Sequence, residues 1–187
     1  VGDYQKQHLE LCRDIAQKFN SDFEIENFLQ VPEPLIQKEF SRIMSLKDGS
    51  RKMSKSELSD LSRINLTDDS DLIVNKIKKA KTDPLPMPNT IKDLDERLEA
   101  KNLLGMYASL TNSTLEKSIE IFAGKNFSEF KEKLSEVLVD KIQPISVEIK
   151  KLLDDKSYLN NTLLEGVERA NIIASKKIKR IKEIVGF

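Results

Sequence analysis

A short stretch of lysine and serine carries the residues best suited to chemistry in this chain. It reads Lys52-Met53-Ser54-Lys55-Ser56, so two ammonium groups bracket a methionine and a serine, and the hydroxyls of Ser54 and Ser56 lie on either side of Lys55. When pyrophosphate leaves a nucleoside triphosphate, charge builds on the leaving oxygens, and mobile ammonium groups stabilise that charge more than the ground state. We therefore predict that Lys52 and Lys55 act on a phosphate chain, with the serines as hydroxyl donors and Met53 against an adenine face.

The residues before this stretch indicate how it is held. An apolar run from Ile43 to Leu46 predicts a short buried strand, and Asp48-Gly49 predicts a turn after it. Ligand-binding loops are often mobile segments that a buried element positions. A solvated basic turn that binds nothing is the alternative interpretation of the same residues.

A second candidate site lies at Val1-Gly2-Asp3-Tyr4-Gln5. A glycine between a strand and a helix lets the backbone approach a ligand closely. The start of the helix then offers N–H donors to anionic or hydroxyl groups. Many ordinary turns have the same pattern, so this motif alone is weak.

Composition limits the kinds of site that the chain can build. Lys and Arg number 31, and Asp and Glu also number 31, so binding to nucleic acid would need local basic patches. The run from Lys176 to Lys182 is such a patch, although it also fits a solvated helix face. One histidine, His8, and one cysteine, Cys12, are too few for a multi-histidine or zinc-ribbon site, so we predict no metal site. No apolar run reaches the ~20 residues of a membrane span, so we expect no membrane partner.

Hydrophobic spacing predicts two kinds of structure. A strand end at 1–3, a helix over 4–19 and short strand candidates at 28–31 and 43–46 follow in this order, as in part of a parallel α/β sheet. Two or three strands cannot cover both faces of such a sheet, so this is half of one. From about Asp93 onward, apolar residues recur at helical spacing, and Pro144 should break or kink one of those helices. We predict a mostly α protein: an α/β remnant over 1–62, then an all-α bundle over 63–187.

Several stretches, in the same order, resemble the bacterial-type tryptophanyl-tRNA synthetases, a family of class I aminoacyl-tRNA synthetases. The stretches are Val1–Leu11, Arg13–Ala16, Val31–Pro34, Arg42–Leu46, Lys52–Ser56, Lys76–Lys78, Lys81–Asp83, Phe122–Lys125 and Val185–Phe187. The Lys52–Ser56 stretch matches the KMSKS signature of class I letter for letter. The resemblance runs from end to end and corresponds to the C-terminal half of the family.

The resemblance implies a fold, an activity and partners. The fold is the second half of a Rossmann-type catalytic domain, followed by a helical domain that binds the anticodon arm of tRNA(Trp). The activity is a ligase reaction: ATP and Mg²⁺ activate L-tryptophan to its adenylate, and the tryptophanyl group passes to the tRNA. A homodimer in the cytoplasm is expected, with the mitochondrion as the alternative location.

The same resemblance implies roles for single residues. Lys52 and Lys55 would be catalytic, and Val1 and Gln5 would border the tryptophan pocket. The residues that would bind ATP are Gly2, Asp3, Tyr4, Ile43, Lys52, Met53, Ser54, Lys55 and Ser56. Tyr4 departs from the family, which usually has an acidic residue at that position. The half of the fold that carries the HIGH signature has no counterpart here, so we expect a fragment that is inactive alone.

Two other hypotheses remain open at the level of sequence. One is a stand-alone helical module that binds tRNA and has lost catalysis. The other is a purely structural helical protein that contains the pentapeptide by chance. A HIGH motif upstream in the gene would favour the ligase over the first, and binding to tRNA would exclude the second.

Overall fold

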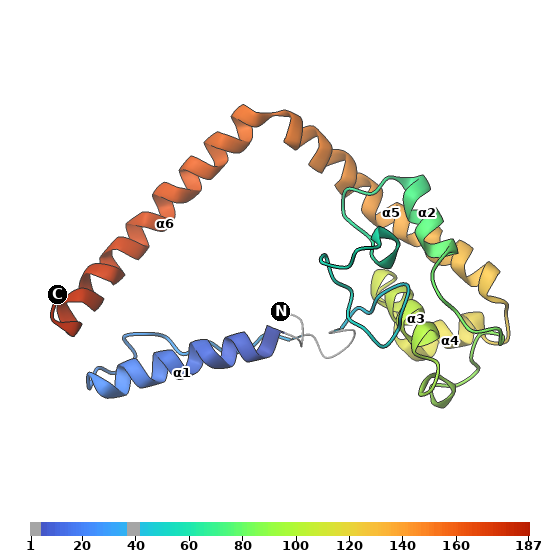
Figure 1. Cartoon of the computed structure of the whole chain (residues 1–187), viewed down its shortest axis with the longest axis horizontal. Coiled ribbons are helices and arrows are strands. Elements are labelled where there is room, and N and C mark those ends of the chain that lie inside the picture. The colour runs from blue at the N-terminus through green and yellow to red at the C-terminus, as the bar shows by residue number, and fades with distance from the viewer. Residues whose placement is uncertain (1–4, 37–41) are drawn as a thin grey trace. The chain divides into compact units, whose positions relative to one another are not determined.

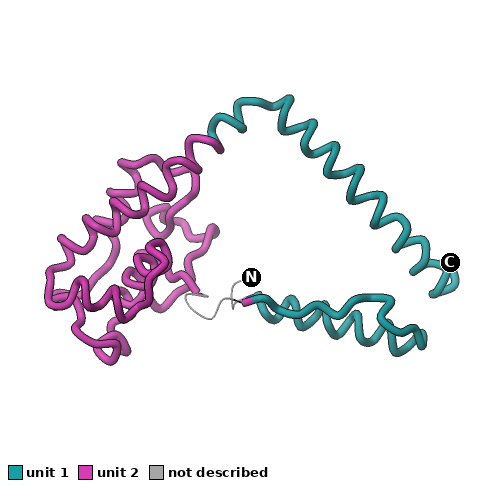
Figure 2. Tube along the Cα trace, turned by 180° about the vertical axis from the view of Figure 1, so that it is seen from behind, with its two compact units in different colours: residues 1, 3–35, 150–187 teal, residues 2, 36–149 magenta. Residues whose placement is uncertain are grey.

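The computed structural model describes residues 5–36 and 42–187 and divides the chain into two compact units. The first unit combines residues 3–35 with 150–187, and the second contains residues 36–149 (Figure 2). The predicted site residues Val1, Gly2, Asp3 and Tyr4 lie outside the described residues. The division of the chain at residues 62 and 63 follows the family resemblance and stays a prediction.

The first unit contains the helices α1 and α6, and local signals bound the second of them (Figure 1). Helix α1 (Lys6–Asp22) buries only Ala16. Helix α6 (Lys156–Val185) begins where the Asp155 side chain accepts a hydrogen bond from the backbone N–H of Tyr158. It ends at Gly186, whose φ of 91° is in the left-handed region that favours glycine. None of the residues of α6 is buried, so its caps rather than a core define its ends.

The second unit builds its core from short helices around one long helix. The helices are α2 (Ser70–Lys78), α3 (Leu98–Leu110), α4 (Leu115–Phe122) and α5 (Phe127–Asp154), with 3₁₀ turns η2 (Asp60–Ser62) and η3 (Lys92–Leu94). The residues Ser113–Glu116 have the form of a capping box and predict a helix start, and α4 begins there, with the Thr114 side chain accepting from the N–H of Lys117. Helix α5 continues through Pro144, so the predicted break is absent, and the apolar stripe on both sides of the proline stays on one helix.

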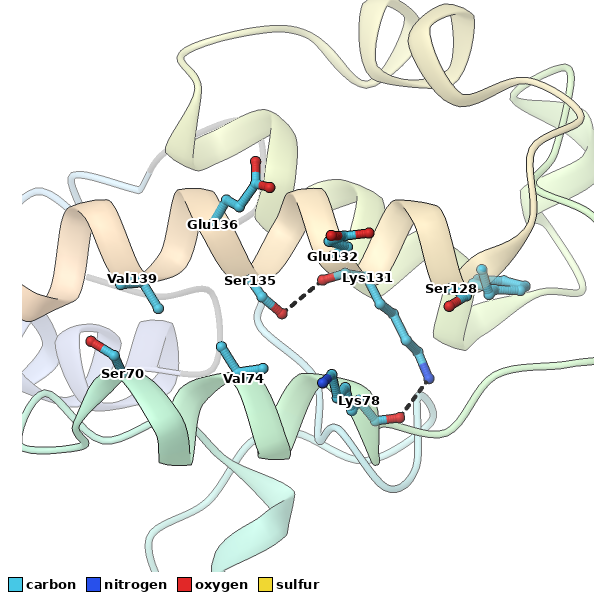
Figure 3. A pocket seen from close by; sticks show the side chains of 10 residues that line it. Ser70, Val74, Lys78, Ser128, Lys131, Glu132, Ser135, Glu136 and Val139 are labelled. Carbon is cyan, nitrogen blue, oxygen red and sulfur yellow. Dashed lines mark hydrogen bonds between the residues drawn. The ribbon is translucent and has the colours of Figure 1, made fainter.

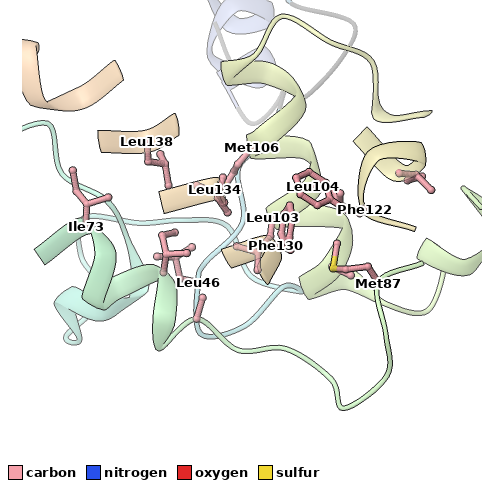
Figure 4. Close-up of a cluster of buried hydrophobic side chains, with 14 of the residues drawn as sticks. Leu46, Ile73, Met87, Leu103, Leu104, Met106, Phe122, Phe130, Leu134 and Leu138 are labelled. Atoms are coloured by element: carbon pink, nitrogen blue, oxygen red, sulfur yellow. The ribbon is translucent and has the colours of Figure 1, made fainter. Parts of the chain in front are cut away.

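The core of this unit is a cluster of aliphatic and aromatic side chains (Figure 4). The rings of Phe122 and Phe130 meet edge to face with centroids 4.8 Å apart, and Tyr107 packs on Phe122 at 4.9 Å. Leu46 also belongs to this cluster and is 2% exposed. The segment before the Lys52–Ser56 loop is therefore anchored in the core, as the apolar run from Ile43 predicts.

Helix α2 lies along α5, and a lysine joins the two (Figure 3). The Nζ of Lys131 donates to the carbonyl oxygens of Ala80 at 2.6 Å and Lys78 at 3.2 Å. These carbonyls lie at the end of α2, where the helix leaves its last acceptors without partners. Burial lowers the pKa of Lys131. Beside this contact lies a hollow of about 770 Å³, and its wall includes Val74 of α2 and Val139 of α5.

The predicted half-sheet is not seen. Among residues 5–36 and 42–187 the β pairing consists of one antiparallel bridge between Met44 and Lys52. The prediction of a mostly helical chain is confirmed, and the Rossmann remnant stays a prediction. The strand candidate at 28–31 forms no ladder, because the side-chain amide of Asn20 bonds both the N–H and the carbonyl of Leu29. No helix in the described part of the chain is long and apolar enough to cross a membrane.

Candidate functional site

The Lys52–Ser56 loop leaves the core from the bridge between Met44 and Lys52. Ser45 donates its N–H to the carbonyl of Arg51 at 2.8 Å, and Met53 donates to the carbonyl of Ile43 at 3.0 Å. These bonds bring Ile43 and Met53 together, and both side chains pack against the core. Lys52 and Lys55 are exposed. The structure thus presents the two ammonium groups to solvent from a base that is fixed to the core.

An asparagine of α3 holds this base from the other side. The Nδ2 of Asn102 donates to the carbonyl of Met44, and its Oδ1 accepts from the N–H of Met44, both at 2.9 Å. Asn102 is 9% exposed, so the pair of bonds satisfies backbone groups that would otherwise lie unpaired at the edge of the core. Sequence reasoning missed Asn102 because its partner lies 58 positions away in the chain.

The neighbouring residue, Leu46, is fixed through its backbone. Its N–H donates to the carbonyl of Ser62 at 2.9 Å, and its carbonyl accepts from the N–H of Lys81 at 2.7 Å. The Nζ of Lys81 lies 2.7 Å from an oxygen of Glu99 on α3, and this hydrogen bond holds the pKa of Glu99 below its usual range. The strand predicted at 43–46 is therefore a single extended segment that four different parts of the chain hold in place.

The predicted turn at Asp48-Gly49 is present and lies against α3. The Oδ1 of Asp48 accepts from the hydroxyl of Ser50 at 2.6 Å and from its N–H at 3.0 Å, and these bonds lower the pKa of Asp48. A Cβ on Gly49 would stand 2.8 Å from the backbone nitrogen of Glu99. A glycine is required here because the turn touches the start of the helix directly.

Within the loop, the two serines bond to each other. The hydroxyls of Ser54 and Ser56 are 2.8 Å apart, and the N–H of Ser56 donates to Ser54 Oγ at 3.3 Å. A hollow of about 460 Å³ opens beside the loop and is lined by Arg51, Lys52, Ser54, Ser56, Glu57 and Leu58. Cations and hydroxyls on one wall of a hollow suit phosphate oxygens, which accept hydrogen bonds from both.

The end of the loop is tied down by charged residues. Arg63 donates to the carbonyl of Glu57 at 2.8 Å, and the carboxylate of Glu57 lies 3.3 Å from the guanidinium of Arg51. Asp60, which pairs with Arg63, also pairs with Lys76, whose side chain is 0% exposed. Helical spacing puts Lys76 with Lys78 and Lys79 on the side of α2 away from its apolar residues and so predicts a polar face, and that prediction is wrong for Lys76. The aspartates that pair with it precede the helix, so the helical pattern does not indicate them.

The other predicted site residue that the structure describes is Gln5. It is exposed and lies at the start of α1, in the first compact unit. Its place at the tryptophan pocket stays a prediction. Residues 5–36 and 42–187 contain no group of three histidine, cysteine or acidic side chains that could hold a metal ion.

Comparison with known proteins identifies the family. The sequence profile of the "tRNA synthetases class I (W and Y)" matches residues 1–172. The chain belongs to this family. The resemblance to the tryptophanyl branch is also confirmed, since curated relatives over the whole chain are named tryptophan–tRNA ligase. They include the proteins of Caulobacter vibrioides, at 49% identity, and Rickettsia felis, at 50%.

Solved structures agree with this assignment. The tryptophanyl-tRNA synthetase of Mycoplasma pneumoniae matches the whole chain with a TM-score of 0.82 and 27% identity, over 55% of its own length. The Campylobacter jejuni enzyme, complexed with ADP and tryptophan, matches with a TM-score of 0.67 and 25% identity, over 56% of its length. The 187-residue chain covers 54% of the Caulobacter protein and 56% of the Rickettsia protein. It therefore spans just over half the length of these relatives.

Proposed function

We propose that this chain supplies the phosphate-binding loop and the tRNA-binding helical region of a tryptophan–tRNA ligase. The observation that carries the proposal is the Lys52–Ser56 loop, with exposed cations on a base that the core holds through Met44 and Leu46. The membership of the chain in the synthetase family gives this loop its chemical context. The parent reaction is the activation of tryptophan by ATP, followed by transfer to tRNA(Trp).

In this proposal the lysines act on the leaving group. The carboxylate of tryptophan attacks the α-phosphate of ATP, the bond to the bridging oxygen breaks, and pyrophosphate departs. Lys52 and Lys55 neutralise charge that grows on the pyrophosphate oxygens, and Ser54 and Ser56 donate hydrogen bonds to the same oxygens. Ile43 and Met53, which share a backbone hydrogen bond, offer an apolar wall to adenine.

The remaining binding roles rest on the family. Gly2, Asp3 and Tyr4 would lie at the ribose, and Val1 and Gln5 at the tryptophan pocket. The described residues do not offer Mg²⁺ a carboxylate ligand set, so we assign the ion to the phosphate oxygens of ATP, which Mg²⁺ prefers, and derive no step through it. The complex with ADP and tryptophan in the Campylobacter relative supports both small-molecule partners.

The helical region from 63 to 187 is proposed to bind the anticodon arm. Exposed cations follow one another in α6 at Lys176, Lys179 and Lys182. Lysines of this kind contact phosphates and position an RNA without reading its sequence. We further propose a homodimer in the cytoplasm, as expected from the family. The stand-alone tRNA-binding module gains no support, because the match to the ligases includes the loop.

The deciding experiment is tryptophan-dependent exchange of pyrophosphate into ATP. A complete protein that contains this chain should catalyse the exchange, and the 187-residue chain alone should not, because the residues that correspond to the HIGH signature are absent from it. Exchange by the isolated chain would contradict the proposal that activation of tryptophan needs residues outside this chain. Absence of exchange in the complete protein would remove the ligase proposal itself.

A substitution in the loop tests its role. Lys55→Ala in the complete protein should lower kcat for exchange by about 10²- to 10³-fold, the effect typical for loss of one transition-state donor. The KM for tryptophan should change little. Lys47→Ala, at an exposed lysine outside the loop, is the matched control and should leave both constants near those of the wild type.

A further inference from the structure

Lys76 of α2 is a charged side chain with no exposure to solvent. Its Nζ lies 2.6 Å from Asp60 Oδ2 and 2.6 Å from Asp68 Oδ2. A buried ammonium is tolerated only when well-placed anionic partners replace its water. Two carboxylates at hydrogen-bond distance provide these partners.

The two aspartates differ in their surroundings. Asp68 is 4% exposed and also accepts hydrogen bonds from the N–H and the side-chain amide of Asn65. Asp60 belongs to η2, and its side chain is 48% exposed. Asp68 and Lys76 therefore form the buried pair. Asp60 adds a second contact that joins η2 to α2.

From Asp60 the contacts lead back to the loop. Its Oδ1 lies 3.0 Å from the guanidinium of Arg63, and Arg63 donates to the carbonyl of Glu57 at 2.8 Å. Glu57 directly follows Ser56, the last residue of the loop. The Glu57 carboxylate also pairs with Arg51, at the start of the loop. One chain of charged contacts thus runs from a buried lysine to the point where the loop rejoins the fold.

We propose that Asp60, held by Lys76, is a positioning residue that fixes the end of the Lys52–Ser56 loop before any ligand binds. The loop's cations must reach phosphate oxygens without a large loss of conformational freedom, and a fixed end lowers that loss. The ligand part of this inference rests on the proposed ligase function, and the loop anchoring does not.

Proteolysis tests the anchoring in the 187-residue chain. Trypsin cleaves after Lys52 and Lys55, so its rate there reports how often the loop opens. Asp60→Ala should accelerate these cleavages about tenfold or more, because Arg63 loses the charged partner that holds it at the end of the loop. Cleavage after Lys101 in α3 should change far less. Asp71→Ala, at an exposed aspartate of α2, is the control and should match the wild type.

A second variant distinguishes loss of the loop anchor from a loss of overall stability. Arg63→Met breaks the link to Glu57 but leaves the pairs of Lys76 with Asp60 and Asp68 in place, and it should also accelerate cleavage in the loop. Unchanged cleavage after Lys55 in either folded variant overturns the anchoring. Equal acceleration after Lys55 and Lys101 in both variants also overturns it, because the aspartate would then serve only overall stability.

Kinetics test the functional part in the complete protein. Asp60→Ala should raise the KM for ATP several-fold in the exchange reaction, with the KM for tryptophan unchanged. An unchanged KM for ATP contradicts a positioning role even if the loop opens more often. If the wild-type protein shows no exchange at all, the ligase proposal fails, and the proteolysis result still decides whether Asp60 anchors the loop.

Discussion

Two polar side chains, Asn102 and Glu99, determine how the base of the loop is held to α3. Asn102 satisfies both backbone groups of Met44, and Glu99 receives Lys81, whose own N–H bonds the carbonyl of Leu46. Each residue acts on the backbone of the extended segment that leads into the loop. Their contributions differ in kind, because one is a neutral amide and the other is a partly exposed ion pair.

The amide contact predicts a clear loss on truncation. Asn102→Ala leaves the N–H and the carbonyl of Met44 without these partners, and each such group costs about 1–3 kcal/mol when buried. Since Met44 is half-buried, we expect the free energy of unfolding to fall by about 1–3 kcal/mol in urea denaturation. Asn171→Ala, at an exposed asparagine of α6, should change it by less than about 0.5 kcal/mol. Equal effects of the two substitutions would contradict the role of Asn102.

The ion pair predicts a dependence on pH. The hydrogen bond from Lys81 lowers the pKa of Glu99 in the folded chain, so its stabilisation is present above the ordinary glutamate pKa and disappears as the pH falls through the folded value. Wild type should exceed Glu99→Gln in stability at pH 7 by up to about 1 kcal/mol, because Lys81 is 60% exposed. The two proteins should converge as the pH falls below the lowered pKa of Glu99 in the folded chain. A difference that persists in acid would show that packing, not charge, is the cause.

At the scale of elements, asparagine side chains bond the backbone of the two segments that the sequence predicts to be strands. Asn102 bonds both backbone groups of Met44, and Asn20 does the same for Leu29. Both segments are apolar, which is why their sequences predict strands. A segment becomes part of a sheet only when a neighbour supplies the complementary ladder. Here the described residues supply one side-chain amide to each segment and, at Met44, a single bridge to Lys52.

The turn between the extended segment and the loop predicts a steric effect. Gly49→Ala places a methyl group 2.8 Å from backbone atoms of Leu98 and Glu99, which cannot move aside without shifting α3. We expect a loss of about 1–3 kcal/mol in stability, measured by thermal denaturation. Gly166→Ala in α6 is the contrasting control, because the new Cβ has no atom within 4 Å. This substitution should stabilise the helix by about 0.5–1 kcal/mol. A neutral Gly49→Ala would refute the close contact between turn and helix.

At the scale of the whole molecule, the core gathers in residues 36–149, whereas α6 buries none of its residues. Phe130 of α5 is 0% exposed and meets the rings of both Phe122 and Tyr107. Leu46, which precedes the loop, lies in the same cluster. Stability of the core and placement of the loop are therefore parts of one packing arrangement.

This arrangement predicts that a core substitution weakens the fold broadly. Phe130→Ala should lower the free energy of unfolding by about 3–5 kcal/mol, the range for a large buried side chain replaced by alanine. Ile178→Ala, at an exposed apolar residue of α6, should cost far less. Denaturation of the two variants in urea gives the comparison, and similar losses would mean that the core does not lie around Phe130.

The sequence by itself determined the helical class of most of the chain, the caps at Thr114 and Gly186, and the Lys52–Ser56 loop with its family. These features depend on residues close together in the chain, where spacing and type carry the information. The tertiary structure decided that Lys76 is buried between Asp60 and Asp68, that Asn102 holds Met44, and that Leu46 reaches the core. Such contacts join residues far apart in the chain. A polar side chain can be buried when a protein group replaces its hydrogen bonds to water, and a helical pattern does not show where such a partner lies.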